Sequence, residues 1–196
     1  MPQPTQPTQP THLPHPTTPS QTVGPFYGFA LPFAGGGEVA PLAHPDTITV
    51  HGYVYDGAGA AVPDVLVETW QPAPDRSRTG ARGSLRRDPA TGRPAGRDGV
   101  VFTGFGRVAT DGDGHYAVRT LPPGGVPYLS MAVFARGLLH HLYTRAYLAA
   151  PGEDPLLGSL PAERRGTLLA TAERPGTYRF DIRLQGECET VFLDFG

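Results

Sequence analysis

The sequence predicts an all-β chain that folds as a two-sheet β-sandwich, with an extended N-terminal arm and one short helix. Glycine and proline supply 26 and 23 of its 196 residues, and both residue types interrupt helices. From residue 47 onward, short runs of β-branched and aromatic residues alternate with turn-forming residues. A series of short strands separated by such turns is typical of a sandwich.

The first part of the chain predicts a tail and an arm. Residues 1–17 are rich in Pro, Thr and Gln and contain no Asp, Glu, Lys or Arg, so we expect them to be disordered. In residues 18–46, X-Pro steps at Pro19 and Pro25 favour an extended chain, and Gly24 allows a close backbone approach. We therefore divide the chain into a tail at 1–17, an arm at 18–46 and a sandwich domain at 47–196.

The strand predictions follow the β-branched and aromatic runs. The first is Thr47–Tyr55, which the turn residues Asp56 and Gly57 end. The later ones are 65–70, 105–110, 116–120, 129–135, 142–148, 178–184 and 190–193. Residues 75–99 are rich in Arg, Gly and Pro and predict one long surface loop. The helix is predicted within 159–169, where Ser159 would cap a first turn that contains Pro161.

The charge balance argues against a polyanionic partner. The chain has 16 Lys and Arg against 18 Asp and Glu, a formal net charge of −2, which leaves no basic surface for nucleic acid or an anionic membrane. It contains no apolar run long enough to span a bilayer and no basic leader before an apolar stretch. We therefore expect a cytoplasmic protein that binds neither nucleic acid nor a membrane.

The residues by themselves predict no catalytic residue and no metal site. Strand ligands are most simply placed two residues apart, and the seven histidines form no His-x-His pair. Cys188 stands in a strand-like sequence between two glutamates, so we expect an unreactive thiol. Asp111-Gly112-Asp113-Gly114 lacks the distal glutamate of a calcium loop and predicts a hairpin turn.

Several motifs resemble the intradiol ring-cleaving dioxygenases, whose core is a prealbumin-like sandwich. The core motifs are Gly52-Tyr53-Val54-Tyr55-Asp56, Val62-Pro63-Asp64, Val67-Glu68-Thr69-Trp70-Gln71, Thr110-Asp111, Gly114-His115-Tyr116 and Pro123-Gly124. Others resemble one group in that family, the alpha chains of protocatechuate 3,4-dioxygenases: 18–22 with Gly24-Pro25, 134–137, 142–145 and 178–187. The resemblance covers residues 18–196 apart from 75–99.

The resemblance implies that this chain holds no metal. In the family, a related beta chain binds a ferric ion through two tyrosines and a His-x-His pair. Tyr128 and Ser130 stand here at the histidine positions, and Leu85 at that of the first tyrosine. The second tyrosine position falls in the shortened segment 122–126. The implied cofactor is thus Fe(III) in a partner beta subunit, with no catalytic residue in this chain.

The resemblance also implies what the chain contributes to catalysis. The alpha chain of the family completes the substrate mouth of the beta chain, and its substrate-binding positions match Thr22, Gly24, Pro25 and Arg136. An arginine fork there would hold the carboxylate of protocatechuate. The implied reaction converts protocatechuate and O₂ to 3-carboxy-cis,cis-muconate in the beta-ketoadipate pathway of aromatic catabolism.

Two other functions stay open from the residues. A prealbumin-like β-sandwich could be a binding module without enzymatic role, and a secretion signal would favour that hypothesis. The chain could also be a self-sufficient dioxygenase with unusual ligands, which iron in the isolated chain would reveal. Without the resemblance, Arg136 is a solvated side chain at a strand end, and Gly24-Pro25 is a simple turn.

Overall fold

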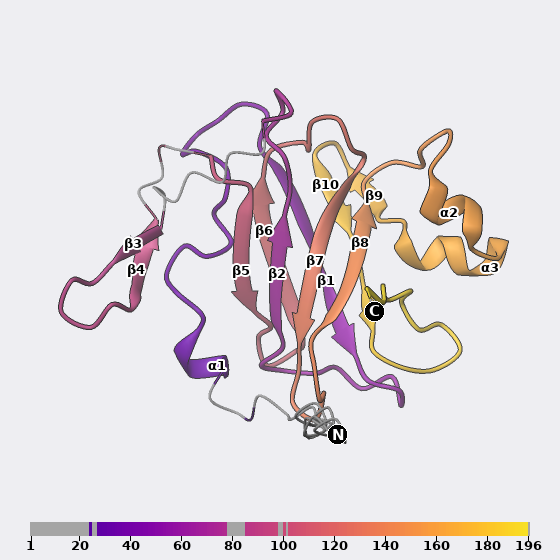
Figure 1. Ribbon diagram of the computed structural model, residues 1–196, viewed down its shortest axis with the longest axis horizontal. Coiled ribbons are helices and arrows are strands. Elements are labelled where there is room, and N and C mark those ends of the chain that lie inside the picture. Colours follow the sequence, from indigo (N-terminus) through magenta and orange to yellow (C-terminus); the bar gives the residue numbers. More distant parts are fainter. Residues whose placement is uncertain (1–23, 25–26, 78–84, 98–99, 101, 196) are drawn as a thin grey trace, which may run out of the picture.

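The chain forms two packed β-sheets and a separate hairpin (Figure 1). The computed structural model describes residues 24, 27–77, 85–97, 100 and 102–195. The first sheet contains β1 (Ile48–Tyr55), β6 (His115–Thr120), β9 (Thr171–Arg174), β10 (Thr177–Arg179) and β11 (Ile182–Arg183). The second has the order β5 (Phe105–Ala109), β2 (Leu66–Trp70), β7 (Tyr128–Phe134) and β8 (Leu142–Tyr147). The predicted two-sheet sandwich is confirmed.

Alternating side chains build the core between the two sheets. Along β1, buried and half-buried residues alternate without interruption, so one face meets the core. Val50 and Val54 of that face pack in one cluster with Leu129, Met131 and Val133 of β7. Between the sheets, the arm closes the gap at one edge. Gly36 accepts a hydrogen bond from the Arg107 backbone N–H, and Val39 donates one to the Arg119 carbonyl, at 2.9 and 2.7 Å.

β1 has two parallel neighbours in succession on one side. Residues Thr49–His51 pair with β10, and Val54–Tyr55 pair with β11. The chain between those neighbours crosses Gly52, where a Cβ atom would lie 1.9 Å from the Phe180 carbonyl oxygen. The same oxygen accepts a 2.6 Å hydrogen bond from the buried Tyr116 hydroxyl. Because Gly52 has no side chain, the backbone at Phe180 can pass close to β1. This close approach keeps β10 and β11 in register with β1.

Some strand boundaries differ from the sequence predictions. The predicted strand 178–184 is wrong as a single element, because Phe180 and Asp181 separate β10 from β11. The predicted strand 190–193 is also absent, and only Leu193 makes a bridge, to Tyr143. Residues 75–99 are not wholly loop, since they contain the hairpin of β3 (Leu85–Arg87) and β4 (Pro94–Arg97). The sequence analysis also missed β9.

The helical elements are short. They are α1 (Tyr27–Ala30), α2 (Pro155–Ser159), α3 (Ala162–Arg165) and the 3₁₀ turn η2 (Gly166–Leu168). The predicted cap at Ser159 is wrong, because Ser159 ends α2 while Asp154 caps it by accepting the N–H groups of Leu156 and Leu157. α1 lies in the segment that we expected to be extended.

Two local predictions concern turns. The stretch Asp111–Gly114 is a turn, but the predicted hairpin is wrong, because the turn joins β5 and β6, which belong to different sheets and do not pair. The Asp111 carboxylate accepts the N–H groups of Asp113 and His115. Cys188 lies in an exposed turn, not in a strand, so its predicted setting is wrong. The reason is that Gly186 adopts φ +103° just before it, and this breaks the extended chain.

Candidate functional site

Arg136 lies in the turn that follows β7, where its guanidinium meets a carboxylate from another loop. Its Nη2 lies 2.6 Å from Oδ2 of Asp64. Both side chains are well exposed, at 60% and 59% of their maximum. Within the described part of the chain, the guanidinium makes one hydrogen bond, from Nη2 to Asp64, so its other N–H groups are not used by this carboxylate. The predicted substrate residue is thus anchored rather than freely solvated.

The backbone of Asp64 is held by the start of β2 and the end of β5. Asp64 adopts φ +61°, a left-handed conformation that Asp tolerates better than most residues. Its neighbour Val65 donates its N–H to the buried Thr110 Oγ1, which in turn donates to the Val62 carbonyl, both at 2.9 Å. These bonds fix the backbone of the loop from which the Asp64 side chain projects.

The arm packs against this ion pair through α1. Tyr27 is only 5% exposed, and burial raises the pKa of its hydroxyl despite the nearby charge and backbone N–H of Arg136. That hydroxyl makes no hydrogen bond of ordinary geometry with any residue that the structure describes. At Gly28, an added Cβ would come within 3.8 Å of the Asp64 Cβ. The structure therefore brings residues 27, 64 and 136 together.

The structure describes two of the four predicted substrate residues. Gly24 has φ +67°, a conformation that glycine adopts without strain. Thr22 and Pro25 lie outside the described residues. The sequence analysis missed Tyr27 and Asp64 as neighbours of Arg136. Asp64 did carry a signal, since Pro63-Asp64 is a turn sequence, but nothing local indicated which residue it would meet.

The positions matched to the histidine pair lie on the outer face of the second sheet. Tyr128 and Ser130 alternate with the buried Leu129 along β7. In the register of β7 and β8, Tyr128 pairs with Tyr147 and Ser130 pairs with Arg145. The carbon at the centre of the Arg145 guanidinium stands 4.3 Å from the centroid of the Tyr128 ring.

A network fixes Arg145 in that place. Its Nη1 donates to the Tyr147 hydroxyl at 3.2 Å, and that hydroxyl donates to the Asp154 carboxylate at 3.0 Å. Burial alone would lower the pKa of Arg145. The hydrogen bond to Tyr147 and the nearby oxygens outweigh that effect, so the pKa lies above its usual value. A permanent cation therefore occupies the face where a metal ion would have to bind.

Of the side chains at these positions, only Tyr128 is a good ligand for a ferric ion, so together they do not form a ferric site. A serine hydroxyl is a poor ligand compared with imidazole, and the Arg145 charge repels a cation. Leu85, matched to the first tyrosine, has a hydrocarbon side chain and lies in β3. Across the described part of the chain, no group of three or more His, Cys, Asp and Glu side chains is placed to hold a metal.

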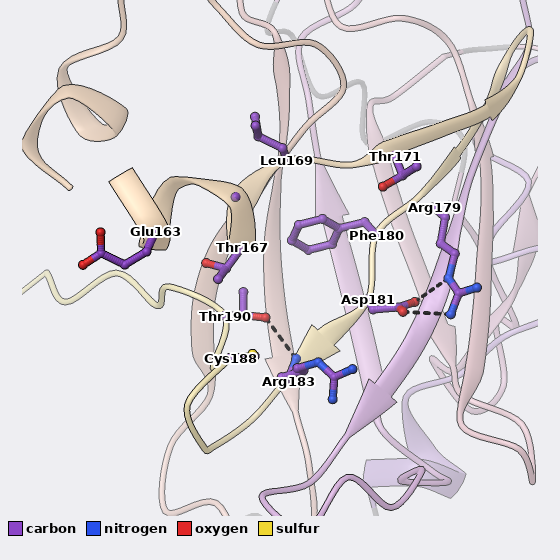
Figure 2. A pocket seen from close by; sticks show the side chains of 11 residues that line it. Glu163, Thr167, Leu169, Thr171, Arg179, Phe180, Asp181, Arg183, Cys188 and Thr190 are labelled. Carbon is purple, nitrogen blue, oxygen red and sulfur yellow. Dashed lines mark hydrogen bonds and ion pairs between the residues drawn. The ribbon is translucent and has the colours of Figure 1, made fainter. Parts of the chain in front are cut away.

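A separate pocket of about 300 Å³ lies beside α3, η2, β10 and β11. Figure 2 shows Thr167, Phe180 and Thr190 around it. Asp181 engages Arg179 through two hydrogen bonds of 3.0 and 2.8 Å. Thr190 accepts the Arg183 N–H at 3.0 Å. Because these polar groups already satisfy one another, we assign the pocket no chemistry.

No helix in the described ranges combines the length and the apolar character that crossing a membrane requires.

Comparisons with known proteins find relatives that align with this chain over nearly their whole length. The chain is 38% identical over 205 residues to the protocatechuate 3,4-dioxygenase alpha chain of Burkholderia cepacia, covering 90% of this chain and 96% of the relative. It is 35% identical over 209 residues to the alpha chain of Pseudomonas putida, covering 92% and 97%. The beta chain of Burkholderia cepacia is 26% identical over 195 residues, covering 81% and 78%. No family model matches the chain.

Among solved structures, the chain is similar to an intradiol ring-cleavage dioxygenase from Tetranychus urticae. The TM-score is 0.50 at 13% identity, over 74% of this chain and 83% of that chain. At this identity the likeness concerns the fold alone, and it agrees with the sandwich described above.

Proposed function

The chain belongs to the protocatechuate 3,4-dioxygenase alpha chains, and we propose that it completes the substrate mouth of a beta subunit without binding iron itself. The observation that carries this proposal is the 38% identity to an alpha chain over 96% of that relative. The weaker similarity to a beta chain supports a hetero-oligomer of two related subunits. The net charge of −2 agrees with partners other than nucleic acid.

The proposed division of labour places the metal chemistry in the beta subunit. When bound there, Fe(III) activates the catechol ring of protocatechuate toward O₂, and 3-carboxy-cis,cis-muconate is formed. The donor set of Tyr128, Ser130 and Leu85 supports the absence of iron from this chain. The Arg145 guanidinium, 4.3 Å from the Tyr128 ring centroid, supports it independently.

This chain's proposed task is to bind and orient the substrate carboxylate. Arg136 offers a planar fork of donors that matches a carboxylate. We infer that Thr22, Gly24 and Pro25 of the arm line the same mouth, since α1 of the arm packs beside Asp64. In this division, residues 18–46 form the arm and 47–196 form the sandwich that carries it. The setting we propose is cytoplasmic, in the beta-ketoadipate pathway.

An oxygen-uptake assay tests this function. We expect uptake with protocatechuate when this chain is co-expressed with a beta chain from the same source, and none when this chain is assayed alone. Uptake should depend on both subunits, because each contributes part of the site. If the beta chain assayed alone took up oxygen as fast as the two chains together, the proposal would be contradicted. If this chain were a binding module without enzymatic role, adding it to the beta chain would change neither the rate of oxygen uptake nor the subunit stoichiometry of the beta chain.

A further inference from the structure

The contact between Arg136 and Asp64 has the geometry of a support. The 2.6 Å contact engages Nη2 only, and a guanidinium carries five N–H donors in a rigid plane. Holding one nitrogen of a planar group restricts the positions that the rest can take. No other hydrogen bond of this guanidinium is present within the described ranges, so the remaining donors can engage a second carboxylate.

The backbone that carries the supporting carboxylate is itself well fixed. Asp64 sits in a left-handed conformation at φ +61°, next to a residue whose N–H is bound by the buried Thr110. On the other side lies α1, with Gly28 near the Asp64 Cβ and with the buried Tyr27 hydroxyl near Arg136. The carboxylate therefore has a fixed loop behind it and a packed helix beside it.

Without such a support, the binding of a ligand by Arg136 would cost more conformational entropy. Its side chain has several rotatable bonds, and their immobilisation opposes the capture of a ligand. A partner that restricts the side chain beforehand reduces that loss. The carboxylate also keeps the guanidinium paired when the mouth is empty.

We propose that Asp64 is a positioning residue for Arg136, which it directs toward the carboxylate of the substrate. This inference rests on the function proposed above, in which Arg136 binds that carboxylate. Asp64 itself touches no substrate in this account. It acts through the direction of the guanidinium, so its effect is confined to substrates that carry a carboxylate.

Two substitutions of Asp64 separate direction from charge. Asn retains a side-chain oxygen that accepts a hydrogen bond and tolerates φ +61°, but it removes the charge. Gly suits the same backbone conformation and removes both the acceptor and the charge. If direction matters, Asp64→Gly therefore has the larger effect. If Asp64 only competes with the substrate for Arg136, both substitutions improve binding to a similar extent.

The measurement is the ratio of kcat/KM for protocatechuate to kcat/KM for catechol, in the assembled complex with the beta chain. We expect Asp64→Gly to lower this ratio about 2- to 5-fold, mainly through KM, because a charge-assisted hydrogen bond orients the fork. Asp64→Asn should fall between wild type and Asp64→Gly. In an Arg136→Ala background, Asp64→Gly should lower the ratio no further.

The chain offers a matched control for each change. Ala43→Gly places a glycine at another left-handed position, φ +56°. Glu38→Gln removes the carboxylate from another exposed pair, in which Arg119 lies 3.2 Å from Glu38. Neither should alter the ratio. These controls test the glycine change and the charge change separately. A loss caused by folding or assembly would lower kcat/KM for both substrates equally and so leave the ratio unchanged.

Three results would overturn the inference. The first is an unchanged ratio in Asp64→Gly, and the second is a raised ratio in both Asp64 variants. The third is a further loss from Asp64→Gly when Arg136 is already alanine. Failure of the proposed function looks different, since the wild-type complex itself would then take up no oxygen with either substrate.

Discussion

Replacing Arg136 by alanine in the assembled complex is expected to lower kcat/KM for protocatechuate roughly 10- to 150-fold. A hydrogen bond to a charged group contributes about 1.5–3 kcal/mol, and the variant removes the whole guanidinium from the proposed mouth. Catechol lacks the carboxylate, so its kcat/KM should fall far less. The measurement is the ratio of the two specificity constants in wild type and variant, with subunit stoichiometry checked alongside.

Arg119→Ala is a suitable control for this variant. Arg119 also forms an ion pair with one carboxylate, Glu38, and is exposed to a similar extent as Arg136. The control should leave the ratio unchanged, because Arg119 lies on β6, on the opposite sheet from β7. An unchanged ratio for Arg136→Ala in a fully assembled complex would remove Arg136 from the site.

The second large effect concerns stability. Gly52→Ala should lower the free energy of unfolding by about 3 kcal/mol or more, because the new methyl group meets backbone that must then move. The Cβ would lie 1.9 Å from the Phe180 oxygen and 2.5 Å from its carbonyl carbon. Moving that segment also disturbs the bond from Tyr116 and the two strands beside β1. Thermal unfolding should show a Tm about 6–12 °C lower.

Gly158→Ala controls for the loss of a glycine. Gly158 lies in α2, and no atom approaches within 4 Å of an added Cβ there. Alanine favours helix over glycine, so this variant should be as stable as wild type or slightly more stable. If Gly52→Ala unfolded at the same temperature as Gly158→Ala, the role given to the close backbone approach would be wrong.

The sandwich could be predicted because its signal is local. Alternation along β1 and the turn residues after it are readable in any short window. The break between β10 and β11 depends on the backbone passing over Gly52, which residue patterns do not reveal. The α2 cap had a readable signal that was missed, since Asp154-Pro155 places a capping side chain before a proline in the first turn.

The candidate site was predictable only in part. Arg136 came from a motif resemblance, whereas Tyr27 and Asp64 come from segments far from it along the chain. Their meeting depends on how the arm and the loop between β1 and β2 pack, which is a tertiary property. Arg145 is a similar case. Its place over Tyr128 follows from the register of β7 and β8, and a shift of one residue would turn it to the other face.

The central claim is that this chain supplies substrate contacts and the partner supplies the metal. It is tested most directly by separating the subunits of the purified complex and measuring iron in each by elemental analysis and visible absorption. We expect iron to stay with the beta chain and this chain to contain none above background. Stoichiometric iron in this chain, with a tyrosinate-to-iron absorption band, would contradict it.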